Sequence, residues 1–151
     1  MLTSSHPRHV LVITNETAEG AVLHETILAS AAAPGSEVLV VAPALNSRLR
    51  HWLSDSDGAR AAAESRLERC MRRLRTDGIA VEGHVGDADP LQAIEDGLVA
   101  FDADEMIIAT HPPERSNWLE HDLVERACAR FGLPVLHVVV DVARSAERLA
   151  A

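Results

Sequence analysis

Short apolar runs alternate along this chain with stretches of helical periodicity, and this alternation constrains the fold more than any other feature. The apolar runs are Val10–Ile13, Val38–Val41, Ile79–Val85, Met106–Ala109 and Val135–Val140. Most are continuous in apolar residues, as is typical of parallel strands that are covered on both faces. Strands that alternate with helices predict an open α/β sheet with right-handed crossovers.

Helix signals occupy the stretches between these runs. Asp89 followed by Pro90 predicts an N-cap and a first helical residue. Asn117 and Glu120 have the spacing of a capping box for the last helix, which we expect to end at Gly132. Between the second and third runs, apolar residues recur at helical spacing; they are Ala63, Leu67, Cys70, Met71 and Leu74.

The length of 151 residues is that of one ordinary domain. We expect residues 1–8 to be a disordered N-terminus and residues 9–141 to form the α/β domain. Residues 142–151 are charged and rich in alanine, and we expect them to be a frayed or loosely helical tail.

Charge and composition exclude several classes of protein. All fourteen basic residues are arginine, which excludes a lysine-dependent phosphate loop, a protein kinase and Schiff-base chemistry. The net charge of −9 argues against nucleic acid as a partner. The densest arginine cluster, between Arg66 and Arg75, is interleaved with Glu68 and is typical of a solvated helix face.

No signal for a membrane, a leader or a metal site stands out. No apolar run approaches the length of a membrane span, and Met1–Arg8 contains no apolar core of a signal peptide, so we expect a cytoplasmic protein. Cys70 and Cys128 have no zinc-site spacing and fall at apolar positions of helical patterns. We predict that both are small core residues and that the chain binds no metal.

Four segments, taken in order, resemble the universal stress protein family. They are HVLVITN, GDADPLQAI (Gly86–Ile94), EMIIAT and LPVLHVVV, and the resemblance covers roughly His9–Asp141. It implies a five-stranded parallel sheet in the order 3-2-1-4-5 with helices on both faces, a Rossmann-like fold of the adenine nucleotide alpha hydrolase type. It also implies a role in stress adaptation and a homodimer, often built through the last strand.

Within the family, proteins that bind ATP carry an Asp after the first strand and a GxxG-x9-G[ST] stretch after the fourth. In this chain the Asp position holds Asn15, and the first glycine position holds Thr110. Pro112 and Pro113 remove amide donors from the loop, and His121-Asp122 stand where the closing G[ST] is expected. ATP binding in the family's usual manner is therefore not expected, and no cofactor is predicted.

The residues that replace this loop still form a candidate site. Ligands of such sheets bind beyond the carboxyl ends of the strands. Arg115 with a helix N-terminus can bind a small anion, and Trp118 can stack on a ring. Alternatively, the prolines and Trp118 close the pocket as a packed lid. The candidate ligand-binding residues are Asn15, Glu16, Thr17, Ala42, Thr110, His111, Arg115, Ser116, Asn117, Trp118, His121 and Asp122.

Three functional hypotheses follow. The first is a non-catalytic module that binds a small ligand or a partner at this edge, with no catalytic residue. The second is an enzyme that uses His111 and His121 on a nucleotide or phosphorylated substrate, which requires the two imidazoles to converge. The third is a structural or regulatory dimer with a filled pocket. The predicted dimer seam comprises Val135, His137, Val138, Val139 and Val140, with His137 as a satisfied edge or core histidine.

Overall fold

The computed structural model describes residues 6–14, 20–43, 56–87, 89–110, 122–141 and 146–150. Its helices and strands alternate as the sequence predicted. In chain order the elements are β1 (His9–Ile13), α1 (Ala21–Ser30), β2 (Glu37–Pro43), α3 (Ser56–Thr76), β3 (Ala80–Gly86), α4 (Pro90–Ala100), β4 (Glu105–Thr110), α5 (Leu123–Phe131), β5 (Val135–Asp141) and β6 (Ala146–Ala150).

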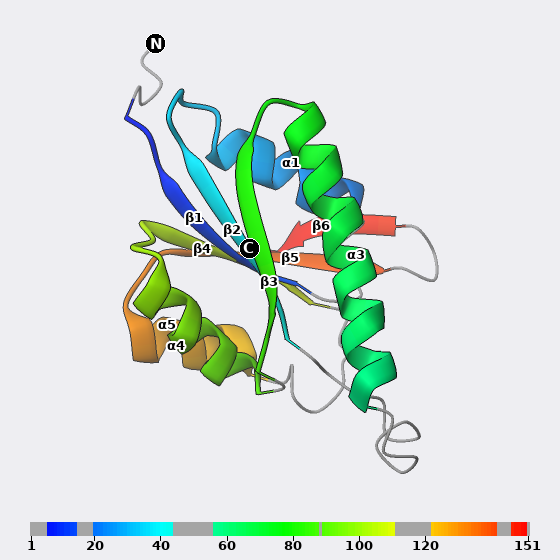
Figure 1. Ribbon diagram of the computed structural model, residues 1–151. Coiled ribbons are helices and arrows are strands. Elements are labelled where there is room, and N and C mark those ends of the chain that lie inside the picture. Colours follow the sequence, from blue (N-terminus) through cyan, green and yellow to red (C-terminus); the bar gives the residue numbers. More distant parts are fainter. Residues whose placement is uncertain are drawn as a thin grey trace.

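The strands form one sheet in the order β3-β2-β1-β4-β5-β6 (Figure 1). β1 to β5 pair in parallel, which confirms the predicted order 3-2-1-4-5. β6 pairs antiparallel with β5 and extends the sheet by one strand. The prediction of a frayed or helical tail is therefore wrong for residues 146–150, because pairing with the edge of β5 overrides the helical preference of this segment.

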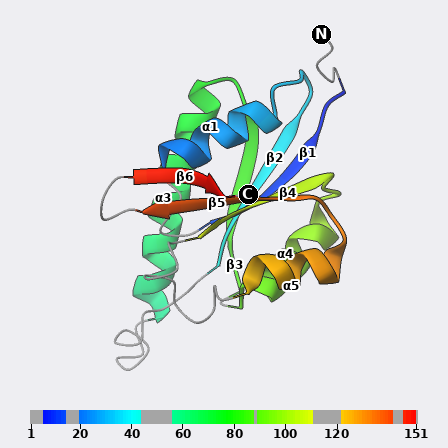
Figure 2. The same cartoon turned by 180° about the vertical axis from the view of Figure 1, so that it is seen from behind.

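Helices cover both faces of the sheet, as Figures 1 and 2 show from opposite sides. Val10 and Val12 of β1 pack in a cluster with residues of α1 and α3. Leu11 and Ile13 pack in a second cluster with residues of α4 and α5. All four side chains are buried. This explains why β1 is continuously apolar, since successive side chains of a strand point to opposite faces.

Several predicted helix boundaries are confirmed. The Asp89 carboxylate accepts a hydrogen bond of 3.1 Å from the N–H of Leu91, and Pro90 is the first helical residue of α4. Gly132 follows the end of α5 with φ of 68°, a conformation that glycine adopts without strain. The predicted cap of α5 is wrong, because that helix begins at Leu123 with Asp122, not Asn117, at the N-cap position.

The two cysteines differ in their environments. Cys70, a residue of α3, is buried in the core, as predicted. Cys128 is exposed, so the prediction of a core position is wrong for this residue. The buried residues of α5 are Leu123 and Ala127, which lie on the face toward the core. Cys128 is the next residue after Ala127 and lies outside that face.

Candidate functional site

Parallel strands of the sheet end together at one edge, where helices α1, α4 and α5 have their N-termini. β1 lies between β2 and β4, so the strand order reverses between β1 and β4. In open α/β sheets, ligands bind in the crevice at this reversal. The candidate site therefore lies at the carboxyl ends of β1, β2 and β4.

Among the described residues, three small buried ones lie where the strands end at this edge. Thr14 follows β1, Ala42 is the last residue but one of β2, and Thr110 ends β4; their exposed fractions are 2%, 1% and 4%. The N–H of Thr14 donates a hydrogen bond of 3.1 Å to the carbonyl oxygen of Val41. The ends of these strands are therefore closed by backbone pairing and small side chains.

The side chain of Thr110 is held by His137 of β5. Thr110 Oγ1 and His137 Nε2 lie 2.7 Å apart. Thr110 lies two residues after Ile108, whose side chain packs in the cluster with α4 and α5, so Thr110 points toward the same face. The hydrogen bond satisfies a hydroxyl that is otherwise withdrawn from water.

His137 is thus a satisfied histidine, as predicted, but its link to Thr110 was missed by the sequence reasoning. His137 pairs with Ile108 in the parallel register, and Thr110 points to the same face two residues farther along β4. Only the register between the two strands brings these residues together.

The helix N-termini at this edge differ in their charges. At α4, the Asp89 carboxylate caps the helix, and Asp87 Oδ1 accepts a hydrogen bond of 2.8 Å from the N–H of Asp89. These carboxylates disfavour an anion there. α1 has Gly20 at its N-cap, with no side-chain cap and no acidic residue in its first turn. Of these two helix N-termini, that of α1 is the better suited to an anion.

Three of the predicted ligand-binding residues are described, namely Ala42, Thr110 and Asp122. Asp122 adopts a left-handed backbone with φ of 63°, and its side chain makes no capping hydrogen bond to α5. The other predicted residues lie outside the described part of the chain; they are Asn15, Glu16, Thr17, His111, Arg115, Ser116, Asn117, Trp118 and His121.

The predicted dimer seam lies on β5, where β6 of the same chain covers the outer edge. Val138 and Val140 are almost fully buried, and Val139 is 9% exposed. Val135 and His137 are half-buried. Pairing through the edge of β5 with another chain therefore requires β6 to leave that edge.

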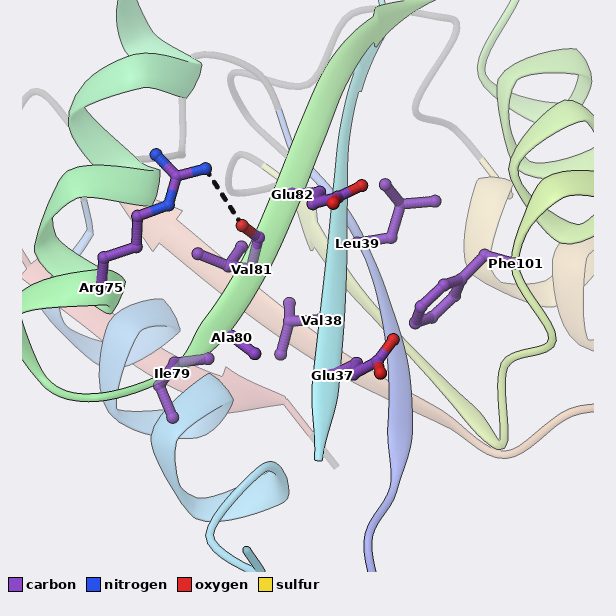
Figure 3. A pocket seen from close by; sticks show the side chains of 9 residues that line it. All are labelled: Glu37, Val38, Leu39, Arg75, Ile79, Ala80, Val81, Glu82 and Phe101. Atoms are coloured by element: carbon purple, nitrogen blue, oxygen red, sulfur yellow. Dashed lines mark hydrogen bonds between the residues drawn. The ribbon is translucent and has the colours of Figure 1, made fainter. Parts of the chain in front are cut away.

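A separate hollow of about 420 Å³ lies at the opposite end of β2 and β3 (Figure 3). On one side of the sheet, the Glu37 carboxylate and the Phe101 ring point toward one another. On the other side, the Arg75 guanidinium donates a hydrogen bond of 3.1 Å to the carbonyl oxygen of Val81. The sequence reasoning did not single out this hollow, because its lining comes from separate elements with no local motif.

The described residues contain no group of three or more His, Cys, Asp or Glu side chains that could hold a metal ion. None of the helices in the described ranges is long and apolar enough to cross a membrane.

Solved structures with the same architecture define the class of this chain. A universal stress protein family member from Burkholderia pseudomallei matches with a TM-score of 0.63 and 16% identity, over 90% of this chain and 98% of that chain. The universal stress protein from Archaeoglobus fulgidus matches with a TM-score of 0.63 and 19% identity, over 86% and 92%. A universal stress protein family protein from Arabidopsis thaliana with AMP bound matches with a TM-score of 0.59 and 12% identity, over 91% and 95%.

The chain is thus an open α/β module with helices on both faces of one sheet. More particularly, it has the universal stress protein fold, as the sequence resemblance predicted. A scan against protein-family models found no match, and a search of curated proteins found no significant match.

Proposed function

We propose that this chain is a non-catalytic universal-stress-type module that acts in a stress response in the cytoplasm. It binds a small anionic ligand at the carboxyl edge of the sheet and does not bind ATP in the manner usual for the family. The fold supports the general class, and the absence of nucleophile or metal motifs from the sequence supports the non-catalytic role.

The hydrogen bond between Thr110 and His137 carries this proposal. Thr110 stands where the resemblance implies a glycine whose amide approaches phosphate. Here the position has a branched side chain that is 4% exposed, and its hydroxyl is already bonded to His137 at 2.7 Å. A glycine lets the backbone approach a phosphate closely, and the side chain of this threonine prevents such a close approach.

Thermal unfolding with ATP tests the claim about nucleotide. A ligand at one hundred times its Kd stabilises a protein by about 2.7 kcal/mol, which raises Tm by roughly 5–11 °C in a chain of this length. We expect millimolar ATP to raise Tm by no more than about a degree. A saturable rise at micromolar ATP would show that the site binds nucleotide after all.

Inorganic phosphate, as the simplest anionic probe, tests the claim about the ligand. We expect a saturable rise in Tm that is lost in Arg115→Gln, because Arg115 supplies the positive charge of the loop after β4. Arg126→Gln is the matched control, since Arg126 is an exposed arginine of α5. Equal responses of the two variants, or no response of the wild-type chain, would refute anion binding through Arg115.

The AMP in the Arabidopsis structure favours a second candidate, binding or hydrolysis of a nucleotide or phosphate ester by the loop after β4. In this alternative, His111 and His121 act as acid and base beside Arg115. The test is the release of phosphate from ATP by the wild-type chain and by His111→Ala. Release that the substitution abolishes supports the enzyme, and equal background rates exclude it.

A further inference from the structure

Strand β3 forms one end of the sheet, and β2 is its only strand partner among the described residues. Val81 packs in the cluster with Leu67 and Met71 of α3, so α3 covers one face of β3. On the other face, Glu82 and His84 are exposed. The outer edge of such a strand carries N–H and C=O groups that can pair with a strand of another chain.

Arg75 of α3 occupies this outer edge. One of its guanidinium nitrogens donates a hydrogen bond of 3.1 Å to the carbonyl oxygen of Val81 and lies 3.9 Å from Met71 Sδ. Figure 3 shows the guanidinium on the side of β3 away from Val38 of β2, so the carbonyl of Val81 points outward. The guanidinium therefore stands where the N–H of an added strand would donate, and it closes the edge at this point.

The outward direction of the Val81 carbonyl decides which other groups of β3 lie on the open edge. The N–H and C=O of one residue point to the same side of a strand, and those of the next residue point to the opposite side. The groups that point outward therefore belong to Val81, Gly83 and Val85, and those of Glu82 and His84 point toward β2.

The sequence of β3, AVEGHVG, is self-complementary about Gly83. A two-fold axis through Gly83 places two copies of β3 antiparallel, and Val81 of each copy faces Val85 of the other in a hydrogen-bonded pair. Glu82 then faces His84 in a non-hydrogen-bonded pair, in which the two Cα atoms lie about 4.5 Å apart. The imidazole N–H can donate to the carboxylate, and no two like charges face each other.

We propose that β3 is a self-association edge that Arg75 holds closed, and that β3 pairs with β3 of a second copy once the guanidinium leaves the carbonyl of Val81. A second copy is the partner that fits, because an antiparallel copy of the same strand brings each Glu82 opposite a His84. This edge lies at the opposite end of the sheet from β5 and β6, so pairing here leaves the predicted dimer seam on β5 unchanged.

Sedimentation velocity of the full chain at increasing concentration tests the proposal. Arg75→Ala removes the guanidinium from the edge, and we expect the mean mass of this variant to rise to at least twice that of the wild-type chain. Arg72→Ala is the matched control, because Arg72 is an exposed arginine of the same helix and its removal changes the charge equally. We expect this control to keep the wild-type mass. Hydrogen exchange locates the contact, and in associated Arg75→Ala we expect slower exchange at the N–H groups of Val81, Gly83 and Val85.

Two variants in the Arg75→Ala background separate pairing in this register from aggregation of a misfolded chain. His84→Glu places a carboxylate opposite Glu82, and we expect the wild-type mass to return, since like charges directly opposite each other are destabilising. Adding Glu82→His exchanges the two side chains, and we expect the larger mass again. An unchanged mass for Arg75→Ala, or the same rise for Arg72→Ala, would overturn the proposal. So would association that persists in the His84→Glu variant, a failure of the exchange to restore it, or exchange slowed only outside β3.

Discussion

At Gly83 of β3, side chains of helix α3 pack closely against the sheet, and the effect of Gly83→Ala follows directly from this contact. A Cβ at this position would lie 2.8 Å from Leu67 Cδ1, 2.8 Å from the carbonyl oxygen of Val40 and 3.0 Å from Met71 Sδ. The two side chains of α3 can move. The carbonyl of Val40 belongs to the neighbouring strand and cannot yield without disturbing the sheet.

The size of the effect combines two opposing contributions. Inserting a methyl group into a packed core costs about 1–3 kcal/mol, and replacing glycine by alanine inside a strand returns about 0.5–1 kcal/mol. We expect a net loss of about 1–2 kcal/mol in the free energy of unfolding, which lowers Tm by roughly 2–8 °C. Thermal and urea unfolding followed by circular dichroism measure both quantities.

Gly97 of α4 provides the matched control, because its surroundings differ in the decisive respect. The nearest atom to a Cβ there is Leu11 Cδ1 at 3.3 Å, the flexible end of a side chain. Alanine inside a helix is favoured over glycine by about 0.8–1.0 kcal/mol. Gly97→Ala should therefore leave Tm unchanged or raise it. If Gly83→Ala is as stable as the wild-type chain, or both variants lose the same stability, the close approach at Gly83 does not limit packing.

Two further substitutions test single contacts by the same unfolding measurements. Asp89→Ala removes the carboxylate that caps α4 through the N–H of Leu91, and we expect a loss of about 1 kcal/mol, whereas Asp89→Ser should retain most of the stability. Arg8→Ala removes the ion pair of 2.9 Å to the mostly buried Glu105 carboxylate. Because Arg8 is about half exposed, we expect a loss of about 1 kcal/mol that shrinks at high salt; an undiminished loss at high salt would contradict an electrostatic origin.

Much of the fold was predictable from the sequence because its signals are local. Apolar runs such as Val10–Ile13 identify strands that are buried on both faces, and Asp89-Pro90 identifies the start of α4 within a few residues. The order 3-2-1-4-5 came from the resemblance, since apolar runs alone do not set strand order. Cys128 shows the limit of periodicity, because one residue on a short helix separates a buried position from an exposed one.

The candidate site was predictable only in part. The resemblance implies a glycine where this chain has Thr110, and the sequence placed Thr110 at the carboxyl edge of the sheet. The partner of its hydroxyl, His137, lies 27 residues away and was assigned to a dimer seam. That contact depends on the register of β4 against β5, and a register depends on how the apolar patterns of both strands meet the same core, which neither strand shows alone.

By itself, the sequence determined the class of fold, the limits of most strands and the absence of glycine between Ala109 and Phe131, because each of these depends on residues that are neighbours in the chain. The tertiary structure alone decided what covers the edge of β5. The segment AERLA has a composition that favours a helix in isolation, yet it forms strand β6. The backbone hydrogen bonds of an uncovered apolar edge outweigh a weak local preference, and that edge exists only once the sheet has formed.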